Sequence, residues 1–286
     1  MFRRSIMLKS LLFLVVCFHL PAVLTAQSNT VQLTYRFNEG ENVQYKTERL
    51  DSMSFEFGGQ SMSRKITSWS LQNISVVDKP STAVTHIKIQ TDSTWNDQES
   101  NDNSGRRTSS ASGGSQRGGG RRMVMRSGPG SGEDGEYRIN QWGLSTTEEP
   151  GITPLLIPLP EKPFSINDSW DFNLPSEIKG HQKGNITVTG QCLLYELSGS
   201  ENSTAVIIVN YESKRDAEFR FQSPQGSISG SSASVSQGTQ LVYFDISKGR
   251  IVETIREETT ESSNETSMGS SNSSSSSKST IKLINS

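Results

Sequence analysis

The sequence predicts an all-β fold. Apolar and polar residues alternate with period two in most segments that contain apolar residues, which places every second side chain on one face of a strand. Threonine, valine, isoleucine and aromatic residues fill these segments, as strands prefer. No stretch after residue 26 has the pattern of a helix of about ten residues or more. We expect two tandem, homologous antiparallel modules, each a half-barrel or a sandwich, with long disordered loops.

Four strands are the clearest, and each shows the alternation over at least three apolar positions. A strand with one apolar face needs a partner layer, so these residues are the candidate core. They are Val31, Leu33, Tyr35 and Phe37; then Met53, Phe55 and Phe57 before the turn at Gly58 and Gly59; then Ala205, Ile207, Val209 and Tyr211; and finally Ala217, Phe219 and Phe221.

Residues 1–26 have the order of a cleavable secretory signal peptide. Basic residues come first, an apolar run begins at Leu11, and a small residue, Ala26, ends the segment. The apolar run is well short of the roughly 20 residues that a membrane span needs, so we expect no span after cleavage. Only Cys192 follows the signal segment, which excludes an intramolecular disulfide. An exported chain without disulfides fits the periplasm or exterior of a bacterium.

Two polar segments interrupt the alternation. Residues 97–135 and the serine-rich residues 261–279 contain too few apolar side chains to offset the entropy of ordering, which predicts disordered loops. The proline-rich residues 150–163 suit an extended connector. The expected domains are therefore residues 27–150 with an insertion at 97–135, and residues 151–286 with a serine-rich loop at 261–279.

The two halves repeat short patterns in the same order, which favours an internal duplication. Residues 37–45 can be aligned with residues 164–172, which places Tyr45 on Phe172. The strand that begins near Ala83 is similar to the one near Ala205. Gly143 and Gly249 each follow a tyrosine by six residues.

Residues 159–170 contain leucine-proline, a charged step, a second proline, then Asn167, Asp168 and Trp170. This phrase, and the residues 35–41, resemble an exported bacterial β-protein family known only as a domain of unknown function. Asn167 stands where that family usually has glycine, and asparagine is the next best residue at a turn with positive φ. The resemblance implies a fold and a compartment, but no catalytic residue. We interpret Trp170 as a core residue.

The sequence offers no motif that would assign catalysis. The two histidines after the signal segment, His86 and His181, lie far apart, and we expect His86 to face solvent. The set of cysteines and histidines is too small for a zinc site. We therefore predict no catalytic, cofactor-binding or metal-binding residue. Acids that a glycan hydrolase could use are present, but no spacing pairs them: Glu148, Glu149, Asp168 and Asp171.

The function we predict is that of a non-enzymatic exported envelope protein, binding or structural, with an apolar groove between curved sheets. Its partner would be an unknown apolar ligand or an envelope protein. A formal net charge of −2 does not favour nucleic acid as a partner. Two alternatives stay open: a secreted carboxylate-dependent glycan hydrolase, and a component of a surface assembly that pairs through strand edges.

Overall fold

A computed structural model describes residues 30–57, 60–101, 123–127, 135–145, 155–178, 182–200, 203–223, 226–266 and 269–285. The chain divides into two units, Met1–Thr30 and Val31–Ser286, and the second unit contains all of the strands. The expected signal segment, residues 1–26, lies outside the described residues, as do His181, Glu148 and Glu149.

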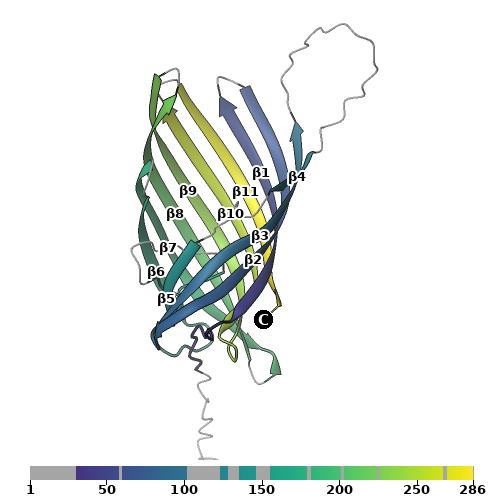
Figure 1. Cartoon of the computed structure of the whole chain (residues 1–286), viewed down its shortest axis with the longest axis vertical. Coiled ribbons are helices and arrows are strands. Elements are labelled where there is room, and N and C mark those ends of the chain that lie inside the picture. Colours follow the sequence, from purple (N-terminus) through teal and green to yellow (C-terminus); the bar gives the residue numbers. More distant parts are fainter. Residues whose placement is uncertain are drawn as a thin grey trace, which may run out of the picture. The chain divides into compact units, whose positions relative to one another are not determined.

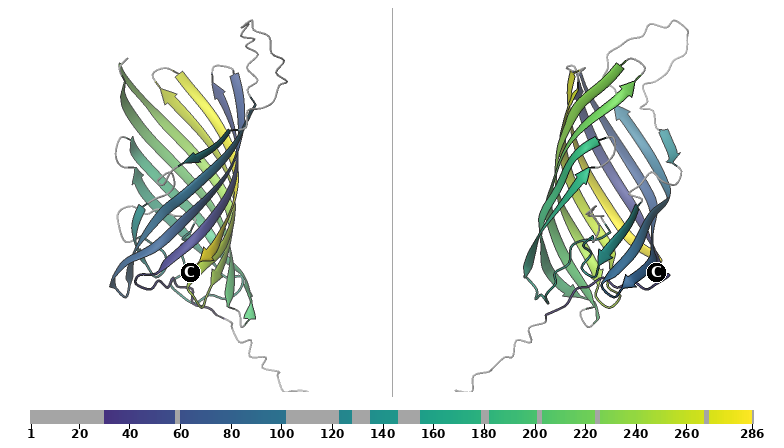
Figure 2. Two further views of the ribbon diagram at one scale, coloured as in Figure 1. Left: turned by 45° about the vertical axis from the view of Figure 1, so that its right-hand side comes forward. Right: turned by 60° about the vertical axis from the view of Figure 1, so that its left-hand side comes forward.

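The described residues form one antiparallel sheet, which confirms the all-β prediction (Figure 1). The sheet is curled, and the two views in Figure 2 show its long strands winding around the open interior. The order across it is β4-β3-β2-β1-β11-β10-β9-β8-β7-β6, and β5 pairs with β3. The strands are β1 (Asn42–Phe57), β2 (Gln60–Ser81), β3 (Val84–Asn101), β4 (Met123–Ser127), β5 (Gly135–Asn140), β6 (Ser169–Ile178), β7 (Gln182–Ser198), β8 (Thr204–Ser223), β9 (Gly226–Asp245), β10 (Arg250–Thr266) and β11 (Gly269–Asn285).

The sheet runs without a break through both halves of the chain. β1 is hydrogen-bonded to β2 on one side and to β11 on the other, with Tyr45 opposite Leu283 and Glu56 opposite Asn272. The last strand of the chain therefore lies beside the first. The structure does not separate the expected modules, residues 27–150 and 151–286, into two sheets.

The prediction of a disordered loop at residues 261–279 is wrong. Most of this segment forms the end of β10 and the start of β11, and each strand has hydrogen-bonded neighbours on both sides. Serine hydroxyls also pair across the strands, as Ser262 and Ser273 do at 2.6 Å. The composition misled because it measures apolar burial, whereas these strands are held by backbone pairing. Of residues 97–135, the first five lie in β3, five form β4, and Gly135 begins β5.

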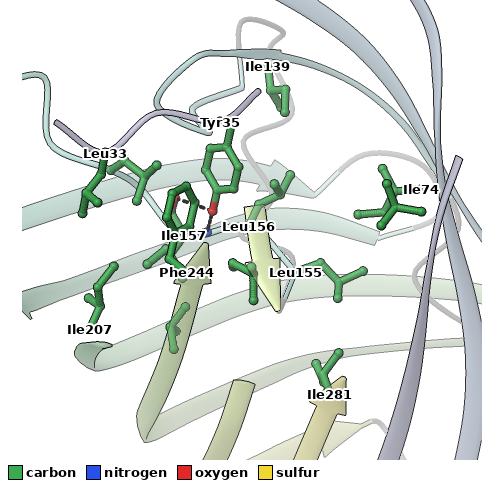
Figure 3. Close-up of a cluster of buried hydrophobic side chains, with 14 of the residues drawn as sticks. Leu33, Tyr35, Ile74, Ile139, Leu155, Leu156, Ile157, Ile207, Phe244 and Ile281 are labelled. Atoms are coloured by element: carbon green, nitrogen blue, oxygen red, sulfur yellow. Dashed lines mark hydrogen bonds between the residues drawn. The ribbon is translucent and has the colours of Figure 1, made fainter. Parts of the chain in front are cut away.

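One face of the sheet, the inner face, is covered at one end by two non-strand segments. Residues 31–37 pair with residue 164 through a single β-bridge at Val31, so the strand expected there is an extended segment instead. Its alternation is as predicted, because Leu33, Tyr35 and Phe37 are buried. The Tyr35 hydroxyl donates to the carbonyl of Ile157 at 3.2 Å and accepts from its amide at 2.9 Å (Figure 3).

The core lies between these segments and the inner face. Residues 155–159 contribute four buried side chains to it, and the strands supply the rest. Cys192 is a free, buried cysteine in this core. Trp170 packs against the core, with its indole Nε1 donating to the Pro158 carbonyl at 2.9 Å and its ring at 5.1 Å from Phe164.

Two tight turns lead into β1 and β6 in the same way. In the first, the Asn38 amide donates to the Glu41 carboxylate at 2.8 Å, and Gly40 has φ 74°. In the second, the Ser165 amide donates to the Asp168 carboxylate at 2.8 Å, and Asn167 has φ 72°. This is the role that the sequence predicts for Asn167.

The pairing after the two turns also corresponds. Tyr45 lies two residues along β1 from Val43, which faces Ile74, and Phe172 lies two residues along β6 from Trp170, which faces Cys192. The register of the next strands matches Ile87 with Ile207, because Ile87 faces Val76 and Ile207 faces Leu194 in the corresponding ladders. Ala83 and Ala205 are thus offset by two residues from the alignment that the sequence suggested.

Candidate functional site

The inner face changes character beyond the core, where two rows of polar side chains cross the sheet. The first row runs Arg49, Ser279, Arg256, Gln240, and the second runs Asp51, Ser277, Glu258, Gly238, Tyr211. We call these residues the polar band. Asp51 is 7% exposed and accepts two hydrogen bonds from Arg49 Nε, at 2.8 and 2.9 Å. Charged groups with so little water require such partners.

Tyr211, Arg256 and Glu258 form a closed network in the polar band. Tyr211 Oη donates to Glu258 Oε2 at 2.6 Å and accepts from Arg256 Nε at 2.6 Å, and Arg256 also pairs with Glu258. The guanidinium lies 5.1 Å from the centre of the Tyr211 ring. Burial raises the pKa of the Tyr211 hydroxyl far above its usual value, so it remains a donor. The network links β8 to β10 across β9.

Glycines make room for aromatic rings along the second row. A Cβ at Gly238 would lie 2.3 Å from Tyr211 Oη, and a Cβ at Gly190 would lie 2.5 Å from Phe172 Cζ. Each ring therefore covers a glycine on the next strand, a packing that fixes the pairing of twisted strands. Gly230 and Phe219 repeat the arrangement near the other end of β8.

Beyond the polar band the inner face is open, and we call this part the open trough. Its two flanks are apolar. On β1 and β2 the flank contains Phe55 directly opposite Met62, with Met53 and Ile66 nearer the polar band. On β6 and β7 it consists of half-buried aliphatic side chains, with Leu174 opposite Val188 and Ile186 next along β7.

The floor between the flanks is made of hydroxyl side chains. Some of them pair with one another, as Ser236 and Thr260 do at 2.8 Å. The floor can donate and accept hydrogen bonds, while the flanks can cover an apolar group. Its residues are Ser213 on β8, Ser232, Ser234 and Ser236 on β9, Thr260 and Ser262 on β10, and Ser271, Ser273 and Ser275 on β11.

The opposite, outward face offers a shallow depression of about 770 Å³ lined mainly by polar side chains. These side chains are already paired with one another. Thr239 donates to Asn210 at 2.9 Å, and Lys278 donates to Glu257 at 2.6 Å. The depression is therefore a ladder of satisfied pairs, and the open trough is the better candidate for a binding site.

The acids considered for a glycan hydrolase do not converge among the described residues. Asp168 is exposed and closes the turn before β6. Asp171 is exposed on β6 and accepts from Gln191 at 3.0 Å. His86 was expected to face solvent, but its side chain is only 16% exposed and lies between Asp78 and Glu136, at 3.7 and 3.4 Å.

The described residues contain no group of three or more histidine, cysteine, aspartate or glutamate side chains that could hold a metal ion. None of the described segments is a helix of the length and apolarity that crossing a membrane requires.

No protein-family model matches the chain, and no curated protein matches it. Two solved structures align with it at low similarity. One is OccK2 (OpdF) of Pseudomonas aeruginosa, at 8% identity and TM-score 0.26, covering 86% of this chain and 100% of that one. The other is a Salmonella typhi OmpF complex with daunomycin, at 5% identity and TM-score 0.24, covering 87% of this chain and 100% of that one. TM-scores this low carry no argument about function.

Proposed function

We propose that this protein is a non-enzymatic exported envelope protein that binds an apolar or amphipathic ligand in the open trough. One observation carries the proposal. Phe55 and Met62 lie opposite each other on the inner face and are 38% and 51% exposed. Large apolar side chains paired side by side in contact with water are a feature of binding surfaces.

The second flank supports the same proposal. Leu174, Ile186 and Val188 line the inner face of β6 and β7, on the far side of the hydroxyl floor. A ligand lying in the trough would remove apolar surface from water at both flanks, at about 25 cal/mol per Å². The hydroxyl floor would bind polar groups of the same ligand. The apolar groove expected from the sequence thus corresponds to two flanks, because the chain's own residues 31–37 and 155–159 fill the apolar part nearer the core.

Export and the envelope location remain part of the proposal. They are supported by the basic, apolar and small residues in the order of a signal peptide at 1–26, and by a single cysteine in the rest of the chain. The resemblance of residues 159–170 to an exported bacterial family of unknown function points the same way. The turn at Asn167 and the packing of Trp170 are compatible with the structural role that the resemblance implies.

We also propose that the sheet arose by an internal duplication, with β1, β2, β3 and β5 corresponding to β6, β7, β8 and β9. The two turns with positive φ at Gly40 and Asn167 support it. So does a shared bond, since the Val76 amide donates to the Glu41 carbonyl and the Leu194 amide donates to the Asp168 carbonyl, at 2.9 and 3.0 Å. Gly143 and Gly249 again both have positive φ after the corresponding strands.

The binding proposal can be tested with the fluorescent fatty acid cis-parinaric acid and protein that begins at residue 27. We expect saturable binding, and at least a tenfold weaker affinity in the double variant Phe55→Ser, Met62→Ser. The matched control is Leu50→Ser, because Leu50 is 47% exposed on the same strand but faces outward. Absence of saturable binding, or equal loss in the control, would overturn the trough as the site.

A further inference from the structure

The outward face carries an apolar row that the core does not use. Leu193, Ile208, Leu241 and Ile255 stand side by side on β7, β8, β9 and β10, each directly opposite the next. All four are partly exposed, and none belongs to the buried core cluster. They lie behind the core, on the other side of the same sheet.

A second row extends this apolar surface toward the core end of the strands. Val206 faces Tyr243 across β8 and β9, and Tyr195 on β7 is 54% exposed. Since residues 31–37 and 155–159 cover only the inner face, none of the described core packing explains apolar side chains here. A sheet face of this kind is a candidate for packing against another layer.

Charged pairs of alternating sign border the apolar rows on the β10, β11 and β1 side. Lys282 pairs with Glu253 at 3.0 Å, and Lys278 pairs with Glu257 at 2.6 Å. On β1, Lys46 pairs with Glu48 at 2.7 Å. A border with equal numbers of both signs does not select a strongly basic or acidic partner, but it can meet a rotated copy of itself with opposite charges in contact.

We infer that this outward surface is a dimer interface, in which a second copy of the chain packs its β7–β10 face against the first. The arrangement is isologous, so each row meets the same row of the other copy across a two-fold axis. Two sheets packed in this way lie about 10 Å apart and bury the aliphatic side chains between them. The inner face and the open trough stay accessible in both copies, so the inference is independent of the proposed ligand site.

The test is the mass in solution of protein beginning at residue 27, measured by sedimentation over a hundredfold range of concentration. We expect a dimer for the unaltered chain and a monomer for Leu241→Glu, with at least a hundredfold weaker association. Val235→Glu is the matched control, because Val235 is 39% exposed on the same strand and the same face, but outside the apolar rows. It should stay dimeric.

Thermal midpoints of both variants show whether each is folded, and Tyr195→Ser supplies a second, milder change in the same surface. A folded Leu241→Glu that remains dimeric, or a Val235→Glu that dissociates equally, overturns the inference. So does an unaltered chain that is monomeric at every concentration, including one that instead binds lipid vesicles through this face. Loss of dimerisation with unchanged cis-parinaric acid binding is the result expected if both proposals hold.

Discussion

Tyr211 lies across Gly238 on the neighbouring strand so closely that a Cβ at residue 238 would be 2.3 Å from the tyrosine hydroxyl. We predict that Gly238→Ala destabilises the protein by about 1–3 kcal/mol, the usual cost of overpacking. The ring cannot move aside without breaking its hydrogen bonds to Arg256 and Glu258. Urea unfolding midpoints of the variant and the unaltered chain measure the change.

A double-mutant cycle separates this contact from the general cost of altering a strand. In a Tyr211→Ala background, Gly238→Ala should cost much less, because alanine has a higher strand propensity than glycine and the ring is gone. Equal costs in both backgrounds would mean that the close approach of Tyr211 does not limit residue 238.

The turns before β1 and β6 give a second prediction. Asn167→Ala and Gly40→Ala should each destabilise by about 1 kcal/mol, because alanine is strained at positive φ. Asn167→Gly should be nearly neutral, since the hydrogen bonds of this turn use the Asn167 amide and the Asp168 carboxylate, not the asparagine side chain. A costly Asn167→Gly would show that the side chain has a role of its own.

Buried tyrosines predict a loss of stability in strong base. Burial raises the pKa of Tyr35 and Tyr45 far above the ordinary value. The folded state therefore keeps these protons, whereas the unfolded chain releases them above about pH 10. The stabilisation is complete below pH 10 and falls as the pH rises, by about 1.4 kcal/mol per tyrosine at pH 11.

The readout is the difference in urea midpoint between pH 8 and pH 11. Tyr35→Phe should lower stability at pH 8, because it loses the bonds to Ile157, but should show a smaller fall between the two values of pH. An equal fall in the variant would assign the alkaline loss to other groups.

Local patterns predicted the parts of the fold that depend on adjacent residues. Alternation identified Leu33, Tyr35 and Phe37 as buried, and asparagine at position 167 indicated positive φ. Both follow from the chemistry of a few neighbouring positions. The same approach failed for residues 261–279, because the partners that hold them, β1 and β9, are distant in the sequence.

The candidate site was only partly predictable for the same reason. Alternation placed Met53 and Phe55 on one strand face, but only the register of β1 with β2 places Met62 beside Phe55. The network of Tyr211, Arg256 and Glu258 joins strands separated by about 45 residues of chain. Such relations are set by strand order, which no local pattern contains.

Trp170 supplies a prediction about the closed end of the sheet. Trp170→Ala should destabilise by about 3 kcal/mol, the lower part of the range for removing a large core aromatic, because the ring is only partly buried. The indole also loses its bond to the Pro158 carbonyl. Ser169→Ala, at the exposed neighbouring position, is the control and should change the urea midpoint little. A fully stable Trp170→Ala that loses cis-parinaric acid binding would make Trp170 a ligand contact instead.

The last prediction concerns the serine-rich strand β11, whose amides should be protected although few of its side chains are apolar. Ser277 faces Asp51 on β1 and Glu258 on β10, so its backbone belongs to a central strand. We expect hydrogen exchange in residues 273–279 to be at least about a hundredfold slower than in an unstructured peptide, as for amides that open only with their sheet. Ser277→Pro should abolish this protection and destabilise the chain, since proline interrupts a central ladder. Ser270→Pro, beside the hairpin end at Gly269, should have a smaller effect. Exchange at the unstructured rate in the unaltered protein would restore the loop that the composition suggested.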